Sequence, residues 1–150
     1  MPKIDKVLFT GKTHTSTTPR ESGSRATHDR LDMKTTASGS GTHQEHTFTA
    51  VLPHPTAEQL FAAAWSACYR GAVELAAQQM KMKLPPDLAI EIQVDLGQTG
   101  DEYFLQAHFN VIVPGVARDV AEALAQRGHE TCPYSKATHG NIDVVTEITV

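Results

Sequence analysis

The chain has 150 residues, of which 40% are hydrophobic and 20% are charged, and its formal net charge is −4. These values are ordinary for a soluble globular protein, and the length suits a single domain over residues 1–150. No basic block or stripe is present, so the sequence does not favour nucleic-acid binding. The most apolar stretch, residues 60–77, is interrupted by Arg70 and Glu74, so we expect no membrane span. The N-terminus lacks the apolar run of a signal peptide, which favours a cytoplasmic location.

Two strands and a polar loop are predicted in the first third of the chain. Residues 7–15 and 26–34 have strand character, and Pro19 and Gly23 between them favour a turn. Residues 35–49 are rich in Thr, Ser and Gly, and their composition predicts a long loop.

A long helix is predicted to begin after Thr56. This residue is a good N-cap, and Gln59 three positions later completes a capping box. The alanine-rich run that follows must stop before Pro85 and Pro86. We expect one stripe of this helix to be buried within the domain or between subunits, namely Leu60, Phe61, Ala64, Cys68, Gly71 and Leu75.

The second half of the chain predicts a hairpin, a second helix and a final strand. Residues 88–96 and 103–113 alternate between apolar and polar side chains, which is typical of antiparallel strands. A helix over residues 116–128 would point Val120 and Leu124 inward, and a strand would follow over residues 142–150. This order of elements predicts an α+β fold.

Two cysteines carry the chemistry that the sequence suggests. They lie 64 positions apart, so they do not form a C-x-x-C pair. A zinc site would need more ligands at short spacing, and none is evident. Burial of Cys68 in the long helix would by itself raise its pKa and make it inert, so a cation from another segment is needed. The alternative interpretation is that both thiols are simply packed in the core.

Cys132 has different surroundings. A residue before proline disfavours helix, so the second helix should end before Cys132, and Pro133 could open a short helical turn through Lys136. A position near a helix N-terminus lowers a thiol pKa. Local features therefore leave open which thiol attacks first.

Two separate segments resemble a known family. The segment AEQLFAAAWSAC, which ends at Cys68, resembles the reactive-cysteine signature of the organic hydroperoxide resistance proteins, a branch of the family that includes osmotically inducible protein C. The segment CPYSKATHGNIDV, which begins at Cys132, resembles their second-cysteine signature. The resemblance covers nearly the whole chain, and it implies an α+β fold of antiparallel sheets around a long central helix in an intertwined homodimer.

The resemblance also implies roles for single residues. Cys68 would be the peroxidatic thiolate and Cys132 the resolving thiol. The spacing of Arg20, Arg25 and Arg30 matches the family's R-x-x-x-x-R-x-x-x-x-R-L-D turn, which assigns the catalytic arginine to Arg20. The family's glutamate corresponds to Glu58. Because Glu58 and Cys68 would lie about 15 Å apart along a straight helix, either Arg20 bridges them or Glu58 acts at the partner subunit's site.

The implied reaction is the reduction of alkyl and fatty-acid hydroperoxides to alcohols. Cys68 would become a sulfenic acid, Cys132 would condense with it to a disulfide, and an external dithiol, typically a lipoylated protein, would restore both thiols. No bound metal, flavin or other cofactor is implied. Aromatic residues could line an apolar substrate pocket, although core packing is the more common role for each, and they are Phe61, Trp65, Tyr69 and Tyr134.

Several positions depart from the family pattern. Thr56 and Ala57 replace the usual Asn-Pro, Ala64 replaces glycine, His139 replaces arginine, and the loop between Arg30 and Glu58 is longer. Two alternatives therefore stay open: an osmotically-inducible-type relative with another peroxide preference, and a redox-responsive or ligand-binding module that has lost turnover.

Other charged residues have simpler interpretations. Arg70 and Glu74 are expected to pair on one helix face, and Arg25 and Arg30 to be exposed strand charges. His129 could assist proton transfer at Cys132, but a surface histidine is the more common case. His43 and His46 alone are too few for a metal site.

Overall fold

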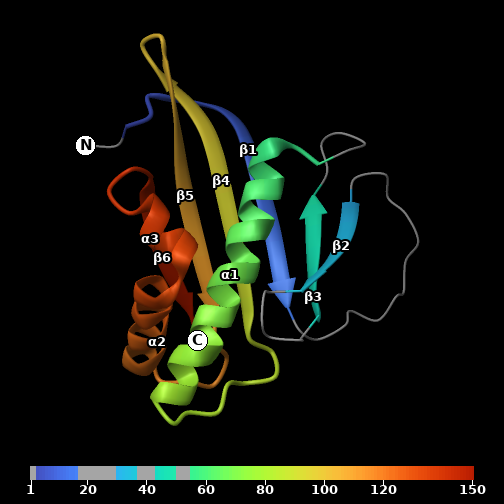
Figure 1. Ribbon diagram of the computed structural model, residues 1–150, viewed down its shortest axis with the longest axis vertical. Coiled ribbons are helices and arrows are strands. Elements are labelled where there is room, and N and C mark those ends of the chain that lie inside the picture. Colours follow the sequence, from blue (N-terminus) through green and yellow to red (C-terminus); the bar gives the residue numbers. More distant parts are fainter. Residues whose placement is uncertain (1–2, 17–29, 37–42, 50–54) are drawn as a thin grey trace.

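The computed structural model describes residues 3–16, 30–36, 43–49 and 55–150, with backbone alone for Ser16 and for the strands at 30–36 and 43–49. Six strands form one sheet in the order β2-β3-β1-β4-β5-β6, and the helices lie against one of its faces (Figure 1). The strands are β1 Lys6–Ser16, β2 Arg30–Thr36, β3 His43–Thr49, β4 Ala89–Thr99, β5 Glu102–Ile112 and β6 Asp143–Thr149. The helices are α1 Ala57–Gln79, α2 Arg118–Thr131 and α3 Pro133–Thr138. The predicted α+β fold is confirmed.

Strand pairing follows the predicted alternation. β4 and β5 form the expected antiparallel hairpin, in which Ile92 lies opposite Phe109 and Thr99 opposite Glu102. All other pairs in the sheet are antiparallel except β5–β6, which is parallel because α2 and α3 carry the chain back across the sheet. The last strand therefore runs beside β5 with the two helices packed over this edge (Figure 1).

The prediction of a loop over residues 35–49 is wrong for the described part of that stretch. β2 continues to Thr36, and β3 occupies His43–Thr49 and pairs with both β1 and β2. The strand has only one large apolar residue, Phe48, so alternation gave no signal. Its threonines and phenylalanine favour extended backbone. Hydrogen bonding to β1 and β2 on its two sides then stabilises the strand, although its apolar alternation is weak.

The beginning of α1 agrees closely with the sequence. The Thr56 side chain accepts a hydrogen bond from the Gln59 backbone, and the Gln59 side chain accepts one from the Thr56 backbone, which completes the predicted capping box. The helix ends at Gln79, ahead of the prolines, and Lys81 follows with a positive φ of 54°. Residues beyond Gln79 thus turn back toward β4 earlier than the sequence indicated.

The core lies between the inward face of α1 and the middle strands. Trp65, Tyr69 and Val73 of α1 are fully buried and pack with Ile92 of β4 and Phe109 of β5. The rings of Trp65 and Tyr69 meet that of Phe109 edge-on, with centroids 4.9 and 5.1 Å apart. These contacts fix the rotation of α1 about its own axis.

The stripe of α1 that was predicted to be buried faces outward in this chain. Leu60 and Leu75 are 46% and 44% exposed, Ala64 is also exposed, and Cys68 and Gly71 are half-buried. The expected burial within the domain is therefore not met for this stripe, because alanine and glycine occur all around the helix and apolar spacing alone did not distinguish its faces. Its burial between subunits stays a prediction. The face that packs on the sheet carries the large aromatic side chains.

A glycine allows α2 to cross α1 closely. A Cβ atom added to Gly128 would lie 2.9 Å from Val73 Cγ2 and 3.1 Å from Tyr69 Cε2. Leu124 of α2 is fully buried beside this crossing, as predicted, whereas Val120 is half-buried. The C-terminal end of α2 is therefore held against the middle of α1.

In the described part of the chain, no helix has the length and apolar character needed to cross a membrane.

We predict that Gly128→Ala lowers the free energy of unfolding by about 1–3 kcal/mol, because the added methyl group has no room against Val73 and Tyr69. Urea denaturation measures the change. A matched control is Ala123→Ser on the exposed side of α2, which should be nearly neutral. Val73→Ala should relieve part of the cost in the double variant, and strictly additive effects would contradict the close crossing.

Candidate functional site

The fold brings the two cysteines together. Cys68 Sγ of α1 and Cys132 Sγ lie 3.2 Å apart, although the residues are 64 positions apart in the chain. Both are free thiols in this structure. A disulfide needs about 2.05 Å between its sulfur atoms, so a small movement would join them.

The sequence around Cys132 explains its position. Cys132 is extended, with φ −66° and ψ 120°, and it both ends α2 and precedes α3. Its N–H donates to the Gly128 carbonyl at 2.9 Å, and its carbonyl accepts from the Lys136 N–H at 3.0 Å. Pro133 at the start of α3 forces this corner because proline cannot continue α2. The predicted helix end and short second helix are both confirmed.

The two sulfur atoms differ in exposure. Cys132 has no exposed surface and belongs to the core, whereas Cys68 is half-buried. A molecule that arrives from solvent therefore reaches Cys68 first. Cys68 is thus the more accessible of the two thiols, and which of them attacks first stays a prediction.

Burial also governs the acidity of Cys68. Loss of solvent raises its pKa to about 11, and the neighbouring Cys132 adds to the rise, while a hydrogen bond from the Tyr134 backbone opposes it. Within the described residues, no cation is among the groups that shift this pKa. The expectation that burial alone leaves this thiol protonated is met, so a cation has to come from elsewhere.

The predicted arginine and glutamate do not complete the site in the described part of the chain. Arg20 lies outside the described residues, as does Arg25, and the side chain of Arg30 is likewise not described. Glu58 lies in the first turn of α1, where a Cβ atom on Gly11 of β1 would be 2.8 Å from the Glu58 Cβ. Glu58 is ten residues before Cys68, about 15 Å along the helix axis. The roles of Arg20 and Glu58 remain predictions.

The four aromatic residues proposed for a substrate pocket fall into two groups. Trp65 and Tyr69 are fully buried core residues, and the Tyr69 hydroxyl donates to the Ala125 carbonyl at 2.9 Å. Phe61 is half-buried with its ring 5.5 Å from that of Trp65, and Tyr134 is 43% exposed. Only Phe61 and Tyr134 thus have surface that a substrate could touch.

Arg70 is not a solvated charge. It is 4% exposed, its Nε donates to Glu74 Oε1 at 3.2 Å, as predicted for an i, i+4 pair, and its Nη1 donates to the Leu88 carbonyl at 3.0 Å. These bonds hold the connection between α1 and β4, away from the thiols.

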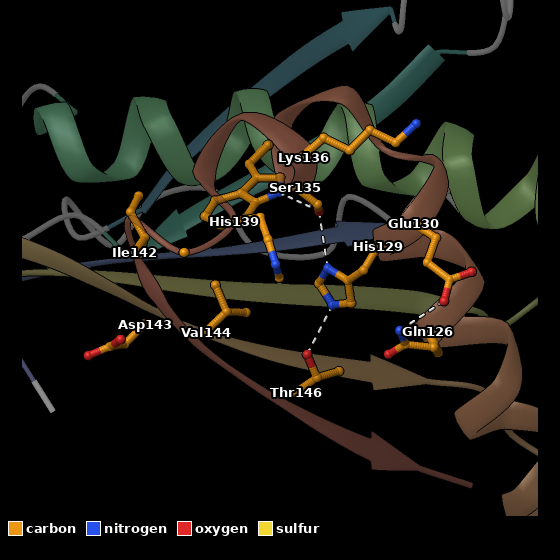
Figure 2. Close-up of a pocket in the computed structure, with 12 residues that line it drawn as sticks. Gln126, His129, Glu130, Ser135, Lys136, His139, Ile142, Asp143, Val144 and Thr146 are labelled. Carbon is orange, nitrogen blue, oxygen red and sulfur yellow. Dashed lines mark hydrogen bonds between the residues drawn. The ribbon is translucent and has the colours of Figure 1, made fainter. Parts of the chain in front are cut away.

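His129 has a larger part in the structure than the sequence suggested. Figure 2 shows it between Ser135 and Thr146, with Nδ1 3.1 Å from Ser135 Oγ and Nε2 3.0 Å from Thr146 Oγ1. Burial lowers the pKa of His129 to about 4, so the ring is neutral at pH 7. The expectation of a surface histidine is therefore wrong. Ser135 and Thr146 were missed because no periodic pattern links residues on two helices and a strand.

A pocket of about 550 Å³ opens beside this histidine. It lies between the end of α2, α3 and the start of β6 (Figure 2), and its charged or titratable lining residues are His129, Glu130, Lys136, His139 and Asp143. Trp65 forms part of its floor, but neither cysteine lines it. Among the residues that the structure describes, no three His, Cys, Asp or Glu side chains are grouped so that they could hold a metal ion.

Comparison with known proteins now adds to this geometry. Residues 49–147 match the model of the OsmC-like protein family, which is about two thirds of the chain. The chain belongs to the OsmC-like family. An organic hydroperoxide resistance protein of Xanthomonas axonopodis pv. citri is 34% identical over 151 residues, and the alignment covers 96% of each chain.

Solved structures of OsmC-like proteins resemble the fold as well. The organic hydroperoxide resistance protein OhrB of Bacillus subtilis is 32% identical, with a TM-score of 0.60 over 79% of this chain and 98% of that one. A relative from Legionella pneumophila, described as an organic hydroperoxide resistance protein OsmC and predicted redox protein, is 28% identical, with a TM-score of 0.61 over 80% and 97% of the two chains. The resemblance to the organic hydroperoxide resistance branch is confirmed.

Proposed function

We propose that this protein is a cysteine-based peroxidase that reduces organic hydroperoxides to alcohols. The observation that carries the proposal is the 3.2 Å contact between a half-buried and a fully buried thiol from distant parts of the chain. Relatives named organic hydroperoxide resistance proteins support the choice of substrate class.

In the first step the Cys68 thiolate attacks the outer oxygen of the O–O bond. The S–O bond forms as the O–O bond breaks, the departing alkoxide takes up a proton, and the products are an alcohol and the Cys68 sulfenic acid. Tyr134, whose backbone hydrogen-bonds to Cys68, and the half-buried Phe61, about two turns earlier on α1, offer apolar surface for an alkyl group.

In the second step Cys132 attacks the sulfenic sulfur of Cys68. A disulfide forms and water leaves, with the thiol proton and the sulfenic hydroxyl as its source. Because Cys132 is already 3.2 Å from Cys68 and buried, this step competes well with attack by a second peroxide.

In the third step an external dithiol reduces the disulfide by exchange. The first thiol of the reductant attacks the Cys68 sulfur, since it is the more exposed one, and Cys132 leaves as a thiolate that is then protonated. The second thiol of the reductant then attacks the sulfur that the first thiol added, so that Cys68 leaves as a thiolate and the reductant becomes a disulfide. The dihydrolipoyl group of a lipoylated protein is the proposed reductant, and the site needs no bound cofactor.

The first step requires a cation that lowers the Cys68 pKa. We assign it to Arg20, whose spacing to Arg25 and Arg30 matches the family turn. A guanidinium within about 4–6 Å lowers a thiol pKa by about 1–3 units, and it can also stabilise charge on the departing oxygen. Glu58 would orient this arginine through a paired hydrogen bond.

The active form is proposed to be a homodimer. The outward stripe of α1 exposes Leu60 and Leu75 on either side of small residues, which lets a second copy approach closely. Phe9 of β1 and Tyr103 of β5 are 61% and 63% exposed, and the alternation of the strands puts them on the face of the sheet that carries the buried Gly11 and Phe109. Exposed apolar surface on two adjacent elements is typical of an interface, and one copy could then present Glu58 to the other's thiols.

We predict that Cys68→Ser lowers dihydrolipoamide-dependent consumption of cumene hydroperoxide to the background rate, because the attacking sulfur is gone. Cys132→Ser should consume a single equivalent of peroxide, accumulate a sulfenic acid at Cys68 and fail to cycle with dithiol. The rate of peroxide consumption measures the first result, and thiol titration with peptide mass mapping measures the second.

Other outcomes of the same experiment separate the alternatives. Turnover that needs a different reductant or peroxide would favour an osmotically-inducible-type relative. Peroxide treatment that leaves both thiols intact would overturn the peroxidase and favour a binding module on the same fold.

We predict that Arg20→Ala raises the Cys68 pKa by about 1–3 units and slows peroxide reduction at pH 7 by about 10- to 1000-fold. Thiolate absorption as a function of pH, in a Cys132→Ser background, isolates Cys68. Arg25→Ala removes a charge from the same segment and is the matched control, with an unchanged pKa expected. Equal shifts in both variants would show a general charge effect and contradict the assignment to Arg20.

We predict that Leu75→Arg converts the protein to a monomer, because it places a charge on the apolar stripe of α1. Analytical ultracentrifugation measures the mass. Val145→Arg on β6, 50% exposed, is the control and should leave the dimer intact. A monomeric wild-type protein would refute the dimer.

A further inference from the structure

The position of Cys132 depends on more than the backbone of its corner. Four side chains form a chain of hydrogen bonds from α1 to β6, here called the His129 network: Trp65, Ser135, His129 and Thr146. Trp65 Nε1 donates to Ser135 Oγ at 3.1 Å, and Ser135 Oγ is bonded in turn to His129 Nδ1 at 3.1 Å. Cys132 lies between His129 and Ser135 in sequence, so these bonds enclose its corner.

The His129 network also connects the corner to the helix of the other cysteine. Trp65 and Tyr69 flank Cys68 on α1, and the His129 ring packs against the Tyr69 ring with centroids 4.5 Å apart. The same ring lies 4.9 Å from that of Phe109, in an edge-on arrangement. His129 Nε2 then joins Thr146 of β6 at 3.0 Å. His129 thus contacts residues of α1, β5, α3 and β6.

We propose that His129 is a positioning residue that holds Cys132 in place for its attack on Cys68. The proposal rests on the role assigned above to the two thiols. For the disulfide to form, the Cys132 sulfur must approach the Cys68 sulfur in line with the bond that it displaces. The two sulfur atoms start 3.2 Å apart. A misplacement of about 1 Å in such a geometry can cost about 100-fold in rate.

The arrangement favours positioning over proton transfer. Both ring nitrogens of His129 already have hydroxyl partners, so neither is free to take the thiol proton. The ring is neutral at pH 7, which suits a network that fixes geometry through one donated and one accepted hydrogen bond.

A peroxide-independent reaction tests the proposal. Dipyridyl disulfide exchanges with the Cys68 thiolate and releases one thiopyridone, which leaves a mixed disulfide on Cys68. Cys132 then attacks the Cys68 sulfur of this mixed disulfide, so that the Cys68–Cys132 disulfide forms and a second thiopyridone leaves. Stopped-flow absorption resolves the two phases, and Cys132→Ser should show only the first.

The decisive variant is His129→Phe, which keeps a ring against Tyr69 and Phe109 but removes both hydrogen bonds. We expect the second phase to slow by about 10- to 100-fold while the first stays within about twofold. His129→Asn, whose amide can still reach Ser135, should recover part of the rate. Thr146→Val removes only the β6 partner and should give a smaller slowing, which tests the proposal even if His129→Phe folds poorly.

Gln126→Ala is the matched control. Gln126 lies one turn earlier on α2, lines the same pocket and bonds only to Glu130 at 3.0 Å among the contacts described, outside the His129 network. An unchanged second phase in His129→Phe, or an equal slowing in Gln126→Ala, would overturn the proposal. If the wild-type protein shows both exchange phases but no peroxide turnover, while His129→Phe still slows the second phase, the peroxidase function is contradicted and the positioning role is supported.

Discussion

The contact between the two sulfur atoms depends on how closely α2 crosses α1. Gly128 leaves no Cβ to separate the helices, and Pro133 ends α2 at the point where Cys132 faces Cys68. A side chain at Gly128, or one more turn of α2, would move Cys132 away from its partner. The proposed chemistry therefore depends on a packing contact in the core that holds the two sulfur atoms 3.2 Å apart.

Burial leaves the two thiols with different access to solvent, and it also opposes the ionisation of Cys68. Full burial protects Cys132 from solvent oxidants, and partial exposure makes Cys68 the first to meet a peroxide. The same loss of solvent raises the pKa of Cys68 to about 11, where only a small fraction is thiolate at neutral pH. The guanidinium proposed above for Arg20 would resolve this conflict, because a nearby positive charge favours the thiolate without exposing it.

The sequence predicted most of the fold through local signals. The capping box at Thr56, the alternation in β4 and β5 and the proline after Cys132 each act within a few residues, and each was confirmed. β3 was missed because its polar residues show no apolar period, and the face of α1 that packs on the sheet was not identified because alanine surrounds that helix. Both errors concern interactions between elements that are far apart in sequence.

For the site, too, the sequence revealed local features but not the contacts between distant elements. Cys68 and Cys132 were identified through motifs, but their contact depends on tertiary packing that no spacing reveals. His129 was misjudged for the same reason, since its partners Ser135 and Thr146 come from a second helix and a strand. A histidine near a reactive thiol is readily assigned a proton-transfer role. Both ring nitrogens of His129 are already hydrogen-bonded, and its ring packs against Tyr69 and Phe109. These contacts favour a geometric role instead, in which His129 affects Cys132 by fixing the position of the backbone between α2 and α3.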